Sequence, residues 1–220
     1  EWIDGAHENG IWPWARPRLD ELGGELPLVV GDTTTGVDLE RVLSLEPDLI
    51  LGLYSAMTQG EYEQLSQIAP TVAQPKGYVD WGVPWQELTR TVGRARGRAD
   101  EAERVVAEVE ARFQGVQEEH PAFVGATAVV ATPYQGIYLY GPEDLRGRFL
   151  RDLGFELPEG LDAIAEGSFG GNISMERTDL LDVDVLLWLD ADPEQEPLAN
   201  PLYQNLGVHQ EAREVFLASY

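Results

Sequence analysis

The sequence contains no cysteine, which excludes disulfides, a catalytic thiolate and cysteine-based zinc or iron–sulfur sites. It also has only three histidines, His7, His120 and His209, and they are far apart in the chain. A site that binds a bare metal ion needs a compact cluster of histidines and carboxylates. We therefore read each histidine as an ordinary surface or core side chain and expect no metal ion held directly by the protein.

Basic residues are scarce. The 15 lysines and arginines face 39 acidic residues, which gives a net charge of -24. This charge opposes binding to phosphate backbones and to anionic membrane surfaces, so no nucleic-acid partner is expected. Long apolar runs are missing too, because no stretch approaches the roughly 18 to 20 residues that span a bilayer. With 43% hydrophobic residues in 220, the chain can still bury a sizeable core.

The sequence lacks the motifs GxSxG, GxGxxG and the phosphate-binding loop. Two acidic pairs, Asp182 with Asp184 and Asp190 with Asp192, flank an apolar run. A carboxylate pair can split its pKa values and carry out acid–base or metal chemistry, so an α/β enzyme that uses such a pair is one alternative. The other is that these carboxylates simply solvate the ends of a strand, which is the reading that a chain this acidic favours.

The stretch VDLERVLSLEPDLILGL, residues 37–53, joins a helical pattern directly to an apolar strand. Leu39, Val42 and Leu43 have helical spacing, and Asp38 is placed to cap the helix. Pro47 ends the helix, and residues 49–53 then form a strand that is apolar on both faces. Such a strand is typical of a parallel sheet covered on both sides.

A similar pattern returns in SMERTDLLDVDVLLWL, residues 174–189. Shifting the sequence by 136 positions aligns Glu40 with Glu176 and Arg41 with Arg177. Duplication and convergence both explain this match. Either way each half of the chain contains a helix followed by a buried strand, so two similar α/β units are predicted.

Two helices are predicted between these units. Pro84 suits a first helical turn, Gly97 interrupts, and Asp100 with Glu103 forms an expected capping pair for a longer helix that stops at His120. After it, two strands surround a turn at 133–136, a helix over 143–155 is closed by a glycine, and helix, loop and strand follow over 200–219. The predicted organisation is a lobe at 1–83, connecting helices at 84–120 and a second lobe at 121–220.

These segments together resemble a class III periplasmic substrate-binding protein of the iron-siderophore type, and their sequences are most like those of actinobacterial members. The resemblance rests on VDLERVLSLEPDLIL, YEQLSQIAPTVA, YLYGPEDLRGRFLRDLGF, ISMERTDLLDVDVLLW and NPLYQNL in this order. It implies an α/β fold of two Rossmann-like lobes joined by a single long helix, with a ligand cleft between the lobes. The family's usual first strand and helix, and its usual final helix, have no counterpart in these 220 residues.

Ligand groups in such folds gather on loops beyond the carboxyl ends of the strands. This rule and the resemblance point to loops that carry aromatic and hydroxyl side chains, which can contact a bulky ligand and donate hydrogen bonds to it. Trp188 and Trp85 are instead expected to pack inside the protein, because Trp188 lies in a strand and Trp85 in a helix. The expected ligand contacts are Trp14, Thr34, Tyr54, Thr58, Trp81, Tyr134, Gln135, Arg148 and Phe169.

Two arginines, Arg146 and Arg148, are the candidate bases at the ligand site. Arg148 has two readings: it reaches the cleft, or it pairs with Asp144 on its own helix. Scarce bases and a strongly acidic surface favour a neutral or cationic ferric hydroxamate over a trianionic catecholate. The alternatives are cobalamin or haem in a similar cleft, the enzyme described above, or an interaction domain without a transport role.

The resemblance also implies partners and a location. It predicts a receptor, not an enzyme, that captures a ferric siderophore and delivers it to an ABC transporter permease, with iron arriving inside the chelator and no cofactor. Glu63 and Glu176 match the acidic residues through which such proteins dock on the permease. The protein is expected to be a monomer outside the cytoplasm, in the periplasm or as a cell-surface lipoprotein whose anchor lies outside these residues.

Overall fold

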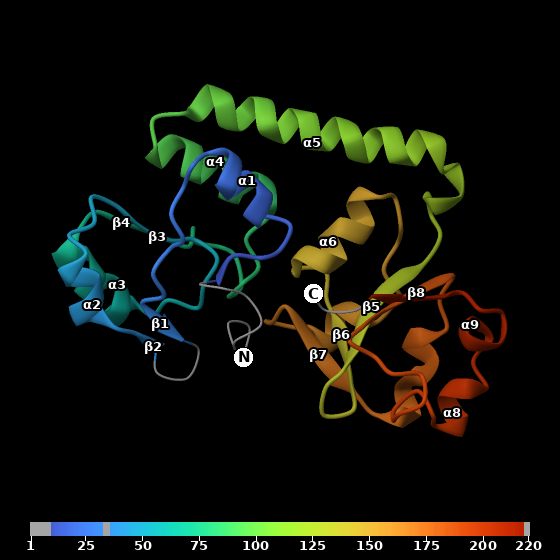
Figure 1. The fold of residues 1–220 in the computed structure, drawn as a ribbon. Helices are drawn as coiled ribbons and strands as arrows, with labels where there is room; N and C mark the ends of the chain where they lie inside the picture. Colours follow the sequence, from blue (N-terminus) through green and yellow to red (C-terminus); the bar gives the residue numbers. More distant parts are fainter. Residues whose placement is uncertain (1–9, 33–35, 218–220) are drawn as a thin grey trace. The chain divides into compact units, whose positions relative to one another are not determined.

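The computed structural model describes residues 10–32 and 36–217. Helices and strands alternate along the chain, and the predicted α/β fold class is confirmed. The chain divides into two compact units (Figure 1). The described part of the first unit consists of residues 10–32, 36–52 and 57–73, and that of the second unit of residues 53–56 and 74–217.

The first unit holds short strands in pairs. In its described residues, β1 (Gly31–Asp32) pairs antiparallel with β2 (Gly36–Val37), and β3 (Ile50–Gly52) pairs parallel with β4 (Thr71–Ala73). Its helices are α1 (Arg16–Glu21), α2 (Leu39–Ser44) and α3 (Gln59–Ile68).

The predicted helix-to-strand junction over residues 37–53 is present as α2 and β3. Asp38 caps α2 by accepting a hydrogen bond from the backbone N–H of Arg41 at 3.0 Å. The parallel pairing of β3 is confirmed, but its predicted burial on both faces is wrong, because Leu51 is 42% exposed. The sheet has only β3 and β4 among the described residues, and the face of β3 that carries Leu51 is open to solvent.

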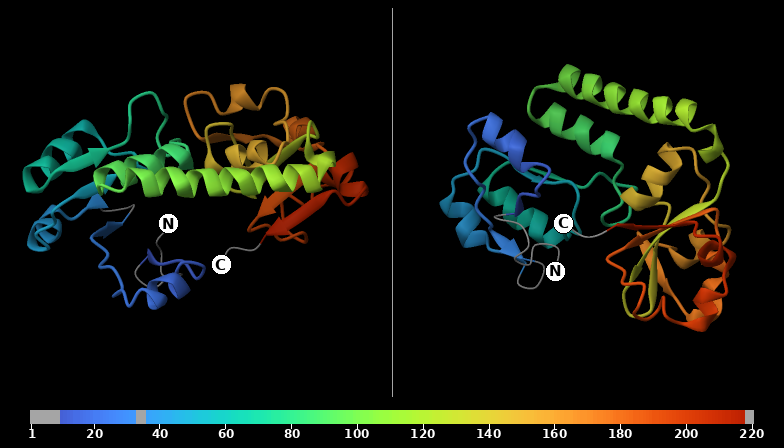
Figure 2. Two further views of the ribbon diagram at one scale, coloured as in Figure 1. Left: turned by 90° about the horizontal axis from the view of Figure 1, so that it is seen from above. Right: turned by 45° about the vertical axis from the view of Figure 1, so that its right-hand side comes forward.

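The two helices predicted over 84–120 are α4 (Trp85–Ala95) and α5 (Ala99–Glu119), which lie side by side in the second unit (Figure 2). Gly97 has a φ of +66° and makes the turn between them. The predicted capping pair is wrong. The N-cap of α5 is Arg98, without a side-chain cap, and Asp100 lies inside the first turn, where its charge still favours the helix dipole.

A five-stranded mixed sheet forms the centre of the second unit, in the order β7-β6-β5-β8-β9. The hairpin of β5 and β6 confirms the turn predicted at 133–136, and Gln135 in that turn has a φ of +51°. β5, β8 and β9 run parallel to one another, whereas β6 and β7 are antiparallel to their neighbours. The strand bounds are Ala128–Pro133 for β5, Ile137–Tyr140 for β6, Gly170–Ile173 for β7, Val185–Leu189 for β8 and Glu214–Leu217 for β9.

Alternate residues of this sheet face two separate apolar cores. One core holds Val129, Leu186 and Trp188, which is 0% exposed as the sequence predicted. Its cover comes from η3 (Met175–Leu181) and from the short helices α7 (Leu161–Ile164), α8 (Pro201–Gln204) and α9 (Gly207–Gln210). The short helices α8 and α9 followed by β9 confirm the order predicted for residues 200–219.

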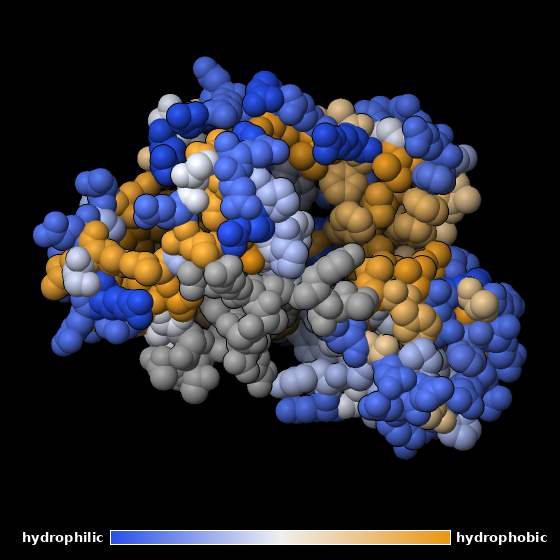
Figure 3. All heavy atoms as spheres, viewed as in Figure 1, coloured by the Kyte–Doolittle hydropathy of each residue, from blue (hydrophilic) through white to orange (hydrophobic). Residues whose placement is uncertain are grey.

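The opposite face of the sheet packs against α6 (Leu145–Asp152) and the short 3-10 helix η2 (Pro121–Phe123), with Leu150 and Phe155 in this second core. Gly154, at a φ of +99°, closes α6 as predicted. Hydrophilic side chains cover the outer side of α5, and hydrophobic ones gather below it over α6 (Figure 3). No helix within residues 10–32 and 36–217 combines the length and the apolar character needed to cross a bilayer.

Candidate functional site

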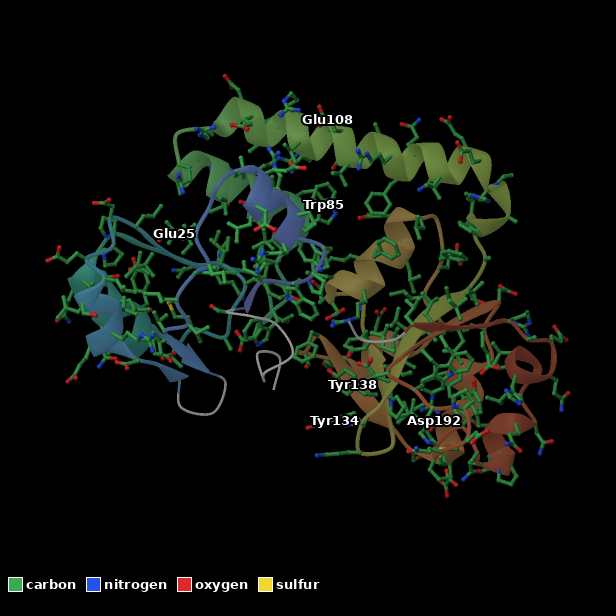
Figure 4. All side chains as sticks on the ribbon, viewed as in Figure 1. Glu25, Trp85, Glu108, Tyr134, Tyr138 and Asp192 are labelled. Atoms are coloured by element: carbon green, nitrogen blue, oxygen red, sulfur yellow. The ribbon has the colours of Figure 1, made fainter. Side chains whose placement is uncertain are left out.

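A row of aromatic side chains lies on the face of β6 that α6 covers. Tyr138 and Tyr140 are two positions apart in the strand and therefore point to the same face. Their ring centroids are 5.3 Å apart, and the ring of Phe169 lies 6.0 Å from that of Tyr138. Tyr134, at the hairpin turn, extends the row with its ring 6.4 Å from Tyr138 (Figure 4). We call these four residues the aromatic row.

The guanidinium of Arg146 stacks on the aromatic row, with its carbon 4.1 Å from the centre of the Tyr140 ring. Asp144 holds it there. Nη1 of Arg146 donates to both carboxylate oxygens of Asp144, at 3.2 and 3.1 Å. Asp144 is also the N-cap of α6 and accepts the backbone N–H of Arg146 at 2.7 Å. One buried carboxylate thus starts the helix and fixes the arginine.

Arg148 lies two residues after Arg146 in α6, and its partners differ from the one considered in the sequence analysis. Its side chain donates to the backbone oxygen of Gly82 at 2.9 Å and to the backbone oxygen and the carboxylate of Glu143. Of the two readings of Arg148, the ion pair with Asp144 is therefore not formed, because Asp144 pairs with Arg146 instead. Arg148 ties the start of α6 to the segment just after Trp81.

Tyr54 and Trp81 form a second aromatic pair in the same unit. Their ring centroids are 5.4 Å apart in an edge-to-face arrangement. Burial, followed by the charge of Asp144, raises the pKa of the Tyr54 phenol, whereas Arg146 and Arg148 lower it. Tyr54 therefore lies within electrostatic reach of all three charged residues at the start of α6. Of the predicted ligand contacts, the structure thus places Tyr54, Trp81 and Arg148 near the start of α6, and Tyr134 and Phe169 in the aromatic row.

The phenols of this site stay protonated. Burial, with the nearby charge of Asp144, raises the pKa of Tyr138 to about 12, and burial also raises the pKa of Tyr140. Burial raises the pKa of Asp144 above its usual value, while its contacts with Arg146 act in the opposite direction. At neutral pH the tyrosines are hydrogen-bond donors rather than anions. The site can therefore offer phenol and guanidinium donors to the oxygens of a ligand.

Other predicted contacts lie elsewhere or have local roles. Trp14 is 74% exposed in the first unit, and Thr34 lies outside the described residues. Thr58 is the N-cap of α3, where it forms a capping box with Glu61 that the pattern T-x-x-E could have revealed. Gln135 is exposed beside Tyr134 in the hairpin turn. All these assignments remain predictions, as do those of the residues in the second unit.

Sequence reasoning missed Tyr138, Tyr140 and the role of Asp144. The alternation in IYLY, which places two tyrosines on one face of a strand, was a signal for the first two. An aspartate just before LRGRFLRD was a helix-cap signal for the third. What the sequence could not give is the placement of these residues against Arg146, which depends on how α6 packs on the sheet.

The alternative sites have structural explanations. Asp184 accepts hydrogen bonds from the N–H and the hydroxyl of Thr127, and Asp182 accepts the N–H of Val208. His120 stacks on Phe123, with ring centroids 5.0 Å apart. Within the described ranges, no three His, Asp or Glu side chains lie together as ligands for a metal ion.

A pocket of about 420 Å³ lies in the second unit, and it shares Arg148 with this site. Arg148 lines it, together with Arg151 and Asp152 of α6 and residues of α4 and α5. Trp85 donates through Nε1 to Asp152 at 3.2 Å, and its ring centroid is 6.5 Å from that of Phe113 (Figure 4). The predicted packing role of Trp85 is confirmed.

Known proteins share both the sequence pattern and the fold. The sequence profile of the periplasmic binding protein family matches residues 6–212. A crystal structure of PiaA from Streptococcus pneumoniae TIGR4 in complex with ferrichrome has 26% sequence identity and a TM-score of 0.82, covering 97% of this chain and 73% of that one. A periplasmic solute-binding protein from Mycobacterium smegmatis has 29% identity and a TM-score of 0.78, covering 97% and 72%.

No curated protein sequence matches the chain. A further structure of Streptococcus pneumoniae PiaA, described as the substrate-binding protein of an iron-uptake ABC transporter, has 26% identity and a TM-score of 0.81 over 96% of this chain and 74% of that one. The family match extends over nearly all of the described residues of both units. This chain therefore belongs to the periplasmic binding protein family.

Proposed function

We propose that this protein binds a ferric siderophore and delivers it to an ABC importer. The observation that carries the proposal is the aromatic row with Arg146 stacked on Tyr140, in a member of this family that is 26% identical to a protein crystallised with ferrichrome. Rigid aromatic faces provide contact area for a bulky chelate, and the phenols and guanidinium donate hydrogen bonds to its oxygens.

A hydroxamate chelate fits the charges of the site better than a catecholate. Three singly charged hydroxamates cancel the charge of Fe(III), whereas three doubly charged catecholates leave a trianion. Arg146 and Arg148 each have a carboxylate partner, Asp144 and Glu143, so neither arginine offers an uncompensated charge. A trianion would lose its hydration there without an equivalent return.

The iron would be cargo and not a cofactor. The family is one of solute-binding proteins, so the chain is not an enzyme, and the alternative of catalysis by an acidic pair is set aside. The protein belongs outside the cytoplasm with its family, and we propose that a lipid anchor from outside these residues holds it at the surface. Cobalamin and haem remain competing ligands for the titration described below.

Several assignments belong to this proposal. We propose that Trp14, Thr34, Thr58, Tyr134 and Gln135 contribute to ligand contact together with the residues around Tyr54. We propose that Glu63 and Glu176, both exposed, dock on the permease, and that the protein acts as a monomer. We also propose that residues 1–83 and 121–220 act as two lobes and that residues 84–120 connect them.

Fluorescence titration tests the proposal. A ferric trihydroxamate should quench tryptophan emission with saturation, the iron-free chelator should bind much more weakly, and the gallium(III) chelate of the same charge should compete with the ferric one. Gallium separates binding from simple absorption of light by iron. If ferric hydroxamates cause no quenching while haem or cobalamin quenches the emission with saturation, the ligand is haem or cobalamin and not a siderophore.

A further inference from the structure

Asp144 is the most buried charged group at the aromatic row, with 1% of the residue exposed. Both of its carboxylate oxygens accept a hydrogen bond from Nη1 of Arg146, and one of them also accepts a hydrogen bond from the backbone N–H of the same residue. The salt bridge is asymmetric in exposure, because the side chain of Arg146 is 26% exposed and that of Asp144 is 2% exposed. The arginine therefore faces the aromatic surface, while the carboxylate lies behind it.

The charge of Asp144 acts on three phenols around the site. It acts on the pKa of Tyr54, of Tyr138 and of Tyr140, always in the direction opposite to that of Arg146. Other charged groups do not add a surplus of positive charge. Arg148 pairs with Glu143, and Asp190, at the end of β8, acts on Tyr140 with the same sign as Asp144.

We propose that Asp144 determines which charge class of ferric chelate this site accepts. By cancelling the charge of Arg146 while leaving its guanidinium stacked on Tyr140, it makes the site select neutral ferric trihydroxamates against anionic chelates. The inference rests on the proposed siderophore function and deepens it, because it assigns the discrimination to one positioning residue.

The physical reason is that arginine stays protonated under all ordinary conditions, so its charge can be removed only by a counter-ion. A compensated arginine keeps its directional N–H donors but attracts anions weakly. Selectivity is a difference between two affinities, and a fixed carboxylate behind the donor lowers the affinity for an anion more than that for a neutral ligand. Burial of Asp144 strengthens this effect because the local dielectric constant is low.

The test uses the whole protein and two ferric trihydroxamates of one scaffold, one neutral and one bearing extra carboxylates. Asp144→Asn retains the size and the helix-capping ability of the side chain but removes its charge. We expect the ratio of the two dissociation constants to move toward the anionic chelate by about tenfold or more. The affinity of the variant for the anionic chelate should also fall as salt rises.

Arg146→Gln and the double variant ensure that the test does not depend on the correct folding of one variant. Arg146→Gln leaves the carboxylate uncompensated, so the ratio should move in the opposite direction. The double variant Asp144→Asn with Arg146→Gln removes both charges, and its ratio should return close to that of the wild type. A merely structural role of Asp144 would lower both affinities together and produce no such reversal.

Asp38→Asn is the matched control, because Asp38 is also an aspartate N-cap, that of α2 in the other unit, where it accepts the backbone N–H of Arg41. It should leave the ratio unchanged. If the wild type binds the neutral chelate but Asp144→Asn has the same ratio of dissociation constants as the wild type, this inference is overturned and the proposed function is left intact. A wild type that binds neither chelate would overturn both.

Discussion

The ring of Tyr54 meets the ring of Trp81 edge to face, with centroids 5.4 Å apart. Tyr54 follows β3 of the first unit but packs with the second unit, where Trp81 also belongs. Trp81 has a φ of +61°, which is unusual for a bulky residue and costs backbone energy. A strained backbone that presents a large ring beside another ring is typical of a binding site.

Replacing Tyr54 or Trp81 by Ala should weaken binding of a ferric trihydroxamate without unfolding the protein. Loss of a partly buried aromatic contact in a binding site costs about 1 to 3 kcal/mol, or roughly fivefold to 150-fold in affinity. Trp85→Phe is the control, because Trp85 packs between helices. Titration calorimetry together with thermal unfolding separates the two effects. Equal affinity in all three variants would refute the ligand-contact assignment.

Tyr203→Phe should lower stability but not binding. The indole Nε1 of Trp188 donates to the hydroxyl of Tyr203 at 2.7 Å, and that hydroxyl donates to Glu214. Both ring systems are 0% exposed, so removing the hydroxyl leaves buried groups without a partner. We expect the free energy of unfolding to fall by about 1 to 3 kcal/mol in urea denaturation. Tyr134→Phe, at an exposed hydroxyl, should change it by less than about 0.5 kcal/mol.

Gly147→Ala should destabilise the protein although alanine favours helices. A β-carbon at Gly147 would overlap the backbone oxygen of Gly141 and lie 3.0 Å from its carbonyl carbon, so α6 would have to shift. The shift would move Arg146 and Arg148 and weaken ligand binding as well. Gly115→Ala in α5 is the matched control, because its β-carbon meets nothing within 4 Å.

The control should gain about 0.5 to 1 kcal/mol from helix propensity. Chemical denaturation of both variants and one ligand titration each are sufficient. A stabilised Gly147→Ala variant with normal affinity would show that α6 tolerates displacement from the hairpin.

Asp184→Asn should show that the hydrogen bonds between Thr127, just before β5, and Asp184, just before β8, stabilise the protein in a pH-dependent way. Hydrogen bonds from the N–H and the hydroxyl of Thr127 lower the pKa of Asp184 below its usual 3.8. A lowered pKa in the folded state means that the carboxylate adds stability above the unfolded pKa and loses it as pH falls through the folded pKa. We expect the variant to be about 1 kcal/mol less stable than the wild type at neutral pH, a small value because Asp184 is exposed.

The stability difference between wild type and Asp184→Asn should stay constant from pH 7 to about pH 5 and shrink below the usual pKa of an aspartate. Unfolding curves at a series of pH values provide the measurement. A difference that grew on acidification would contradict the sign argued above.

Charge reversal at Glu63 or Glu176 should impair transport while leaving ligand affinity intact. Each lies exposed, Glu63 on α3 of the first unit and Glu176 in η3 of the second. Salt bridges to arginines of the permease would become repulsive in Glu63→Lys and Glu176→Lys. Glu108→Lys on α5, which breaks only an exposed pair with Arg104, is the matched control. Siderophore uptake with the reconstituted permease tests this, and uptake equal to the control would refute the docking role.

Local chemistry was predictable wherever a few neighbouring residues determine the backbone. Asp38 capping α2, Gly97 between two helices and Gly154 after α6 were all expected from the sequence. The errors concern relationships beyond the neighbourhood. Leu51 looked buried because its strand is apolar, but burial depends on how many strands join the sheet and what covers them.

The sequence by itself determined the order of helices and strands and the excess of acidic charge, because spacing, capping residues and composition act locally or through simple sums. Only the tertiary structure decided that Arg146 pairs with Asp144 and stacks on Tyr140, and that Arg148 pairs with Glu143. Four charged residues within one short segment allow several pairings. The packing of α6 on the sheet chooses among them, because it buries one carboxylate and leaves the other in contact with solvent.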